Sequence, residues 1–199
     1  MNSKELAKKI IKGHYPILDP SYVPDWEPFR LAEEILAQGH RVLQLRCKTV
    51  NEADYKALAE QIYYLKIHND FSIILNHHVQ VVQDIDADGV HLTAESVSVS
   101  EARCILGKGK VIGQSVHSIE EGIQAEKEGV DYLTLGAIFE TPHKQSDHPI
   151  QGIENLKTMV ESVSIPVVAI GGIDESNKAQ VMDSGCAACS GIRMFIPRS

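Results

Sequence analysis

The run Ile165-Pro166-Val167-Val168-Ala169-Ile170 is followed directly by Gly171-Gly172-Ile173, and the fold can be read outward from this stretch. The apolar, β-branched residues predict a short strand. The paired glycines behind them mark a turn. A strand, a glycine turn and a following helix, in this order, are the repeating unit of an α/β protein.

Seven further apolar runs of this kind occur, most of them with a helical pattern behind. They cover residues 15–18, 42–46, 71–75, 89–92, 111–113, 132–136 and 186–189. The eight runs recur about every 20–30 residues, which is the spacing of βα units. Eight such units in 199 residues predict one α/β domain over residues 1–199, a minimal (β/α)8 TIM barrel. A doubly wound open sheet is the alternative.

The end of the chain leaves little room for a normal last helix, because only residues 191–199 follow the eighth predicted strand. We therefore expect a last helix that is shortened or missing. The Leu6, Ile10 and Ile11 face of a short N-terminal helix, or the second subunit of a homodimer, would then cover the flank left open.

Composition excludes several classes of protein. The chain is 43% apolar, which is enough for a sizeable core, and its formal net charge is −8. This acidity argues against nucleic acid or an anionic membrane as the main partner. The N-terminus lacks the apolar segment of a secretory signal, and four cysteines are too few for a disulfide framework. We expect a cytoplasmic protein that binds a small molecule.

Two glycine-containing segments follow the seventh and eighth predicted strands, at Gly171-Gly172 and Ser190-Gly191. The loops after these two strands commonly bind phosphate in (β/α)8 barrels. Glycines let backbone N–H groups approach the anion closely. The sequence therefore predicts a phosphate-binding site at these four residues. Tight turns that require a positive φ are the alternative explanation.

His117 stands near the end of the fifth predicted strand, just before Ser118-Ile119-Glu120-Glu121, whose Ser and Glu fit a capping box. A histidine at the carboxyl end of a barrel strand lies over the pocket, and imidazole can both accept and donate a proton near neutral pH. His117 is therefore the candidate catalytic residue. A simple hydrogen bond to a neighbouring loop is the alternative.

The second predicted strand carries alternating polar residues, Gln44, Arg46 and Lys48. A period of two places the three side chains on one face, which we expect to point into the barrel. Buried polar groups are unfavourable unless they bind a ligand or one another, so these are candidate substrate contacts. Layered polar packing inside the barrel is the alternative. The polar loop 140–152 is the candidate active-site lid.

A CxxC spacing and two histidine pairs are weak evidence for a redox site or a metal site. The CxxC spacing at residues 186–189 lies on a predicted strand, where residues three apart face opposite sides, so a disulfide is not expected. The histidine pairs His77-His78 and His143 with His148 lack a third ligand at a convincing spacing, so we expect no metal site.

Taken in order, five segments resemble the thiamine phosphate synthase and thiazole tautomerase family of phosphate-binding barrels. They are Gln-Leu-Arg-Cys-Lys at 44–48, Asn76, Ala-Asp-Gly-Val-His-Leu at 87–92, Ile-Gly-Gln-Ser-Val-His at 112–117 and Ile-Pro-Val-Val-Ala-Ile-Gly-Gly-Ile at 165–173. Any one segment is weak, but the set in this order is specific. The likeness runs from about Val42 to Gly191.

The resemblance implies one of two chemistries. The synthase joins an aminopyrimidine pyrophosphate to a thiazole phosphate, and two aspartates hold the Mg²⁺ that neutralises the departing pyrophosphate. At the two matching positions this chain has His77, after Asn76, and Ser96. Mg²⁺ prefers carboxylate oxygen, so these residues are poor replacements, although Glu95 stands next to Ser96.

The lid also departs from the synthase pattern. Thr141 and Lys144 match this pattern, but its second threonine is absent here. Residues 115–121 and 124–128 are similar to the tautomerase branch. We therefore expect a metal-independent tautomerase without a cofactor, an isomerase that aromatises a carboxythiazole phosphate. His117 would move the proton, acting first as base and then as acid.

The expected substrate contacts complete this hypothesis. The residues beside the ring and its carboxylate are Gln44, Arg46, Lys48, Asn76, Ser115, Thr141 and Lys144, and the phosphate would lie on Gly171, Gly172, Ser190 and Gly191. Two alternatives stay open. One is a Mg²⁺-dependent thiamine phosphate synthase, and the other is a non-catalytic regulatory protein that binds thiazole phosphate.

Overall fold

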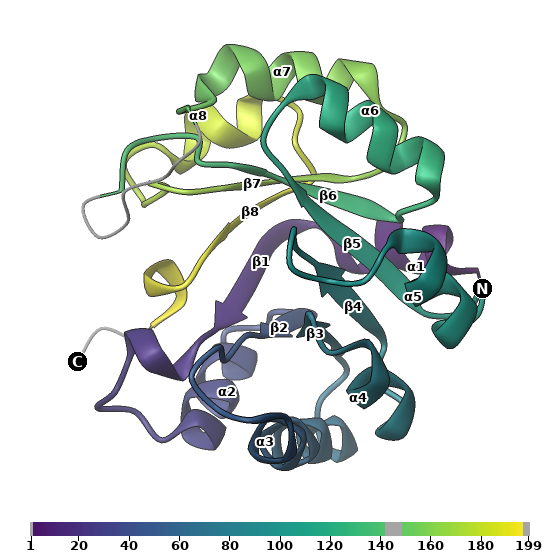
Figure 1. The fold of residues 1–199 in the computed structure, drawn as a ribbon. Coiled ribbons are helices and arrows are strands. Elements are labelled where there is room, and N and C mark those ends of the chain that lie inside the picture. Colours follow the sequence, from purple (N-terminus) through teal and green to yellow (C-terminus); the bar gives the residue numbers. More distant parts are fainter. Residues whose placement is uncertain (1, 142–148, 197–199) are drawn as a thin grey trace.

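A computed structural model describes residues 2–141 and 149–196. Eight parallel strands pair in chain order and close into a barrel, with the last strand beside the first (Figure 1). The strands are β1 (Gly13–Leu18), β2 (Val42–Leu45), β3 (Ser72–Asn76), β4 (Gly89–Leu92), β5 (Val111–Val116), β6 (Tyr132–Gly136), β7 (Val167–Ile170) and β8 (Ala188–Gly191). The predicted (β/α)8 barrel is confirmed, and the open sheet is excluded.

Helices follow the strands on the outside of the barrel. They are α2 (Pro28–Ala37), α3 (Glu52–Tyr64), α4 (Val79–Asp84), α5 (Val99–Leu106), α6 (Ile119–Glu128), α7 (Gly152–Ser162) and α8 (Lys178–Asp183), preceded in the chain by α1 (Ser3–Ile10). Short 3-10 turns are η1 (Pro20–Tyr22), η2 (Leu65–Ile67) and η3 (Arg193–Phe195). No helix in the described part of the chain is long and apolar enough to span a bilayer.

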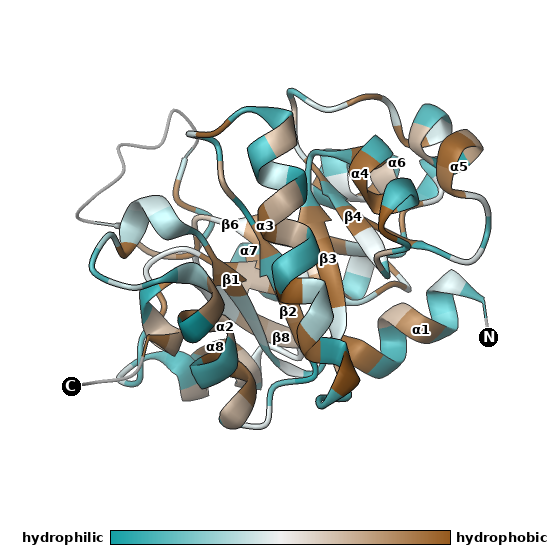
Figure 2. Cartoon of the chain, turned by 90° about the horizontal axis from the view of Figure 1, so that it is seen from below, coloured by the Kyte–Doolittle hydropathy of each residue, from teal (hydrophilic) through white to brown (hydrophobic). Residues whose placement is uncertain are grey.

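Two apolar layers result from the alternation of side chains along the strands. Outward residues such as Leu43, Ile73 and Leu133 pack against the surrounding helices. Inward residues, among them Ile74 and Val168, fill the lower part of the barrel. Figure 2 draws the strands largely in brown and the surrounding helices with long teal stretches.

The helix α1 closes the amino end of the barrel, and the expectation that it covers the flank of the missing last helix is wrong. Its apolar residues Ala7, Ile10 and Ile11 belong to the same cluster as the inward residues of the strands. Ser3 Oγ donates a 2.8 Å hydrogen bond to the buried carboxylate of Asp131. The lower end of the barrel is lined by apolar inward side chains, so the apolar helix face packs there and is removed from water.

The turn η3 covers the flank instead. It is the only helical element behind β8 in the described part of the chain, so the expected loss of a normal last helix is confirmed there. Phe195 is buried, and its ring centroid lies 5.5 Å from that of His14 and 5.1 Å from that of His40. Gln38 Nε2 donates to the Phe195 carbonyl at 3.2 Å.

Three strand boundaries differ from the prediction in ways that matter for the site. β2 ends at Leu45, so Arg46 and Lys48 lie in the loop beyond it, where they form ion pairs with Asp19 and Glu95. β5 continues to Val116, and β8 begins at Ala188. Ser190 and Gly191 consequently belong to a strand and not to the loop behind it. The cysteines at 186 and 189 are free thiols, as expected.

Candidate active site

A layer of polar side chains fills the carboxyl end of the barrel interior. Its members come from inward positions of six adjacent strands: Tyr15, Gln44, Asn76, His91, Ser115, Tyr132 and Thr134. Tyr132, the first residue of β6, reaches the layer only through its hydroxyl. Room for the large Tyr132 ring comes from Gly113, because a Cβ atom at Gly113 would lie 2.0 Å from that ring. The ring therefore lies inside the barrel, where its hydroxyl reaches the layer.

One chain of hydrogen bonds crosses this layer. Asn76 Nδ2 donates to Gln44 Oε1 at 3.2 Å, and Gln44 Nε2 donates to the Tyr15 hydroxyl at 3.1 Å. The hydroxyls of Tyr15 and Tyr132 lie 2.6 Å apart. The Tyr132 hydroxyl is 2.9 Å from His91 Nδ1. Five side chains from five strands are thus joined in one network.

The donor and acceptor roles along this series of hydrogen bonds follow from which groups have a proton to donate. The Tyr15 hydroxyl already accepts a proton from Gln44, so its own proton is satisfied only by Tyr132. Tyr132 in turn donates to His91 Nδ1, which leaves the imidazole proton on Nε2. Nε2 donates to Ser115 Oγ at 2.9 Å, and the Thr134 hydroxyl donates to the same oxygen at 3.2 Å. The Ser115 hydroxyl, which accepts both of these bonds, keeps its own proton.

His91 is neutral in this arrangement. Burial lowers its pKa from 6.5 to about 3, because the interior disfavours the imidazolium. A neutral imidazole has one donor and one acceptor, as the network requires. Burial also raises the pKa of the Tyr15 hydroxyl, so Tyr15 remains protonated. The layer is an uncharged hydrogen-bonding platform.

Ion pairs form a charged corner above the ends of β1, β2 and β4. Arg46 pairs with Asp19, a fully buried carboxylate behind β1. Lys48 Nζ lies 2.8 Å from Glu95 Oε2, and both side chains are exposed. The Lys48 ammonium holds the pKa of Glu95 below its ordinary value. Both described carboxylates of this corner are therefore already paired with a cation.

The two positions that the resemblance assigns to a metal come together beside these pairs. His77 Nδ1 lies 2.9 Å from Ser96 Oγ, and Ser96 Oγ also accepts from the backbone N–H of Thr93 at 2.9 Å. His77 has a φ of 70°, in the left-handed region, where few residues other than glycine are found. No group of three or more His, Cys, Asp or Glu side chains within residues 2–141 and 149–196 is arranged to hold a metal.

This donor set does not fit Mg²⁺. Mg²⁺ is held by oxygen ligands in octahedral geometry, usually through one or two carboxylates. An imidazole tied to a serine hydroxyl supplies neither a carboxylate nor an open pair of oxygens. Glu95, the neighbouring carboxylate, is bound to Lys48. Within residues 2–141 and 149–196, no aspartate stands in place of the two that the resemblance assigns to the metal.

His117 lies beside β6 at the barrel mouth. Its Nδ1 donates to the Gly136 carbonyl at 2.9 Å, so the ring is held between β5 and β6. Ser118 caps α6 by accepting from Glu121 N at 3.2 Å, as predicted. Glu121 Oε2 accepts from the His117 N–H at 2.7 Å and not from Ser118, so the capping box is incomplete. Gln151 Nε2 donates to the His117 carbonyl.

Backbone conformation and close packing are sufficient to explain why glycines follow β7. Gly171 and Gly172 have φ values of 100° and 67°, and a Cβ on either would lie within 2.6 Å of residues 137–140. The backbone N–H groups of Gly172, Ile173 and Ile192 make no hydrogen bond within the described chain. These donors, at the ends of β7 and β8, are what an anion requires.

Ser190 contributes differently from the prediction. It is buried on β8, and its hydroxyl donates to the Tyr15 carbonyl at 2.7 Å. Its one proton is therefore used within the barrel and is not available to a ligand. Gly191 ends β8 beside Ile192. Thr141 lies at the edge of the described lid, and Lys144 lies outside the described residues.

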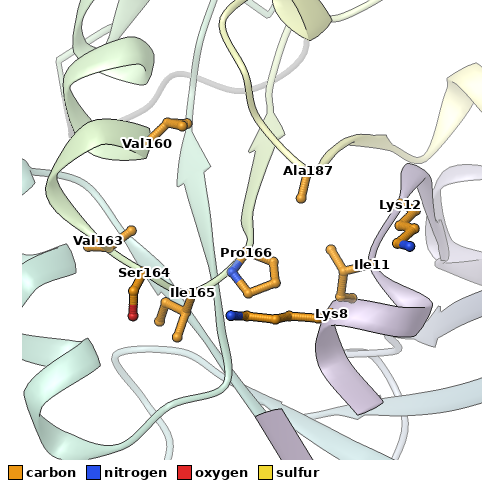
Figure 3. A pocket seen from close by; sticks show the side chains of 9 residues that line it. All are labelled: Lys8, Ile11, Lys12, Val160, Val163, Ser164, Ile165, Pro166 and Ala187. Carbon is orange, nitrogen blue, oxygen red and sulfur yellow. The ribbon is translucent and has the colours of Figure 1, made fainter. Parts of the chain in front are cut away.

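A hollow of about 420 Å³ lies on the opposite side, between α1 and the segment that leads into β7 (Figure 3). Lys8 reaches across it toward Ser164 and Pro166, and the lining contains no member of the polar layer. Functional groups of (β/α)8 barrels gather at the carboxyl ends of the strands. The polar layer, and not this hollow, is therefore the candidate active site.

Sequence reasoning missed several residues of the layer. The sequence indicates His91 only through the resemblance at residues 87–92, and it gives no functional signal for Tyr15, Thr134 or, in the charged corner, Asp19. A signal existed for His91, because it stands at an alternate position of a strand otherwise made of Gly, Val and Leu. Asp19 carried no such signal, since its partner Arg46 is distant in the sequence.

The fold and this site define a (β/α)8 barrel with an uncharged polar floor, a charged corner on one side and backbone anion donors on the other. A sequence profile described as thiamine monophosphate synthase matches residues 14–195, so the chain belongs to that family. A thiamine-phosphate synthase of Clostridium botulinum strain Loch Maree is 35% identical over 184 residues, covering 92% of this chain and 90% of the relative.

Two further relatives agree. A thiamine-phosphate synthase of Halalkalibacterium halodurans is 37% identical and covers 86% of this chain and 81% of its own length. The solved structure of thiamine phosphate pyrophosphorylase from Pyrococcus furiosus has a TM-score of 0.84 at 32% identity, covering 92% of this chain and 87% of that one. An epimerase from Clostridium perfringens, 20% identical with a TM-score of 0.68, shares the fold alone.

These findings overturn the expected tautomerase. Relatives 35–37% identical over most of the chain carry the synthase name, and synthases are transferases, so the isomerase assignment is wrong. The structure explains why the similarity of residues 115–121 to the tautomerase branch predicted the wrong activity. Ser118 caps α6 and Glu121 binds the His117 N–H, so part of this motif secures the end of β5 and the start of α6.

Proposed function

We propose that this chain is a thiamine phosphate synthase, a transferase that joins an aminopyrimidine pyrophosphate to a thiazole phosphate. In the reaction the bond between the pyrimidine methylene carbon and the pyrophosphate oxygen breaks. A bond from the same carbon to the thiazole nitrogen forms, and pyrophosphate leaves. The similarity to named synthases over most of the chain supports this assignment. Both substrates are small phosphate esters, in line with the small-molecule partner that the sequence predicts.

The observation that carries the proposal is the pair of anion-accepting places on either side of one polar layer. Arg46, Lys48 and His77 stand at the ends of β2 and β3. The N–H groups of Gly172 and Ile192 stand at the ends of β7 and β8. In the closed barrel these strand pairs are separated by β1 on one side and by β4, β5 and β6 on the other. One substrate with one phosphate needs one such place, whereas the proposed reaction needs two.

The polar layer supplies the groups for the rings between these places. Gln44, Asn76 and Ser115 offer fixed donors and acceptors of the kind that an aminopyrimidine requires. Holding two reactants in one orientation is itself a large part of catalysis for a bimolecular transfer. The transfer needs no proton shift between ring carbons, so the proton-shuttling role expected for His117 does not enter this proposal.

The test is a product assay with the purified chain, the aminopyrimidine pyrophosphate and the thiazole phosphate, in the presence and in the absence of Mg²⁺. We expect thiamine phosphate and inorganic pyrophosphate in equal amounts. Gln44→Ala, which removes the centre of the hydrogen-bonded layer, should lower the rate strongly, and Gln80→Ala, an exposed glutamine on α4, should not. Binding of thiazole phosphate without product, with or without Mg²⁺, would overturn the proposal.

A further inference from the structure

We propose that the corner formed by His77 and Ser96 binds the pyrophosphate of the substrate directly, through the imidazole, and does not hold a divalent cation for it. This inference rests on the proposed function for the identity of the anion. It concerns the residues that stand where the resemblance places the metal aspartates. Three observations on the structure carry it.

The first observation is the conformation of His77. Its φ of 70° lies in the left-handed region, which histidine, asparagine and aspartate adopt more readily than other residues with side chains. The backbone is held there by the His77 N–H, which donates to the His91 carbonyl at 2.9 Å, and by Val79 N–H, which donates to the His77 carbonyl at 3.0 Å. The conformation therefore fixes an imidazole at the end of β3.

The second observation is the hydrogen bond that orients this ring. His77 Nδ1 is joined to Ser96 Oγ, and Ser96 Oγ already accepts from the Thr93 N–H. The ring is thus anchored through one nitrogen, and Nε2 is the nitrogen left to face a ligand. Because the Ser96 hydroxyl keeps its own proton to donate to Nδ1, the ring carries its proton on Nε2 and presents an N–H donor to an anion. Its neighbour His78 turns elsewhere, stacking on Tyr55 with ring centroids 4.1 Å apart.

The third observation is the balance of charge. Asp19 and Glu95 are each paired with a cation, Arg46 and Lys48 respectively. Among residues 2–141 and 149–196, both carboxylates of this corner, Asp19 and Glu95, are thus occupied, whereas pyrophosphate brings several negative charges. Lys48, whose exposed ion pair with Glu95 is weak, can turn toward an added anion, whereas Arg46 stays on the buried Asp19 carboxylate. The corner is suited to an anion and unsuited to a bare cation.

The first experiment measures metal binding without turnover. Mn²⁺ binding is followed by electron paramagnetic resonance in the wild type, in His77→Asp/Ser96→Asp and in His78→Asn. Aspartate tolerates the left-handed region, so the double variant keeps the backbone while it restores two carboxylates. We expect the double variant to bind Mn²⁺ at least about tenfold more tightly than the wild type and His78→Asn. Equal binding by the wild type and the double variant would overturn the inference.

The second experiment measures the anion. Calorimetric titration with inorganic pyrophosphate in excess EDTA should show binding by the wild type and by His78→Asn. His77→Asn, which also tolerates the left-handed region, should bind about tenfold more weakly, the equivalent of about 1.4 kcal/mol. Pyrophosphate binding that requires Mg²⁺, or that His77→Asn leaves unchanged, would contradict the inference. Circular dichroism confirms that each variant is folded.

These outcomes separate the inference from the proposed function. Metal-free pyrophosphate binding through His77, without thiamine phosphate formation, would remove the function and leave the anion site. Thiamine phosphate formation by a wild type that binds Mn²⁺ as tightly as the double variant would support the proposed function and overturn the metal-free anion site.

Discussion

His91 should make the protein sensitive to mild acid. In the folded chain its pKa is lowered by burial to about 3, whereas in the unfolded chain it returns to the ordinary value of 6.5. Above pH 6.5 both states are neutral at this residue, and it adds nothing to the pH dependence. As the pH falls below 6.5, the unfolded chain binds a proton that the folded chain does not bind until about pH 3. The free energy of unfolding therefore decreases over this range.

The magnitude follows from the size of the shift. Each pH unit between the two pKa values changes the free energy of unfolding by about 1.4 kcal/mol. Between pH 7.5 and pH 5 the contribution of His91 amounts to about 2 kcal/mol. His14, His40 and His78, whose pKa values are lowered mainly by burial, act in the same direction. A variant of His91 alone isolates the contribution of this residue to the pH dependence of the free energy of unfolding.

The assay is urea unfolding at pH 5, 6 and 7.5 for the wild type, His91→Gln and His68→Gln. Glutamine keeps a donor and an acceptor between Tyr132 and Ser115 but does not titrate. We expect His91→Gln to lose about 2 kcal/mol less than the wild type between pH 7.5 and pH 5. His68 is exposed, so its variant should follow the wild type. Curves for the wild type and His91→Gln that run parallel would refute the neutral, buried histidine.

Three further predictions concern packing and burial. Gly113→Ala places a Cβ 2.0 Å from the Tyr132 ring and should lower the free energy of unfolding by about 3 kcal/mol, whereas Gly109→Ala, which meets open space, should have little effect on urea unfolding. Phe195→Ala uncovers His40, so its pKa should rise from about 4, which a histidine titration by NMR would detect; an unchanged value would mean that η3 does not cover this flank. Ser3→Ala removes a hydrogen bond to buried Asp131 and should lower stability by about 2 kcal/mol; no change in thermal unfolding would contradict the anchoring of α1.

Local pattern was sufficient for the architecture of the barrel. Runs such as 89–92 and 132–136 coincide with β4 and β6, because a buried parallel strand is recorded in adjacent apolar residues. Gly129, placed after α6, has the left-handed conformation that ends a helix. The loss of a normal last helix followed from the few residues behind the eighth strand. The choice between transferase and isomerase did not follow, since residues 115–121 carry a structural role and the similarity of the whole chain outweighs them.

Only closure of the barrel decided which distant residues meet. Asp19 and Arg46, or Lys48 and Glu95, are separated in sequence and are joined because β1, β2 and β4 end at one rim. The position of α1 under the barrel depends on an open apolar end that exists only after all eight strands have paired. Side-chain periodicity is a property of neighbours in the chain, whereas an active site is a set of neighbours in space. The amino-acid sequence therefore determined the strands, and the tertiary structure determined the polar layer and the charged corner above it.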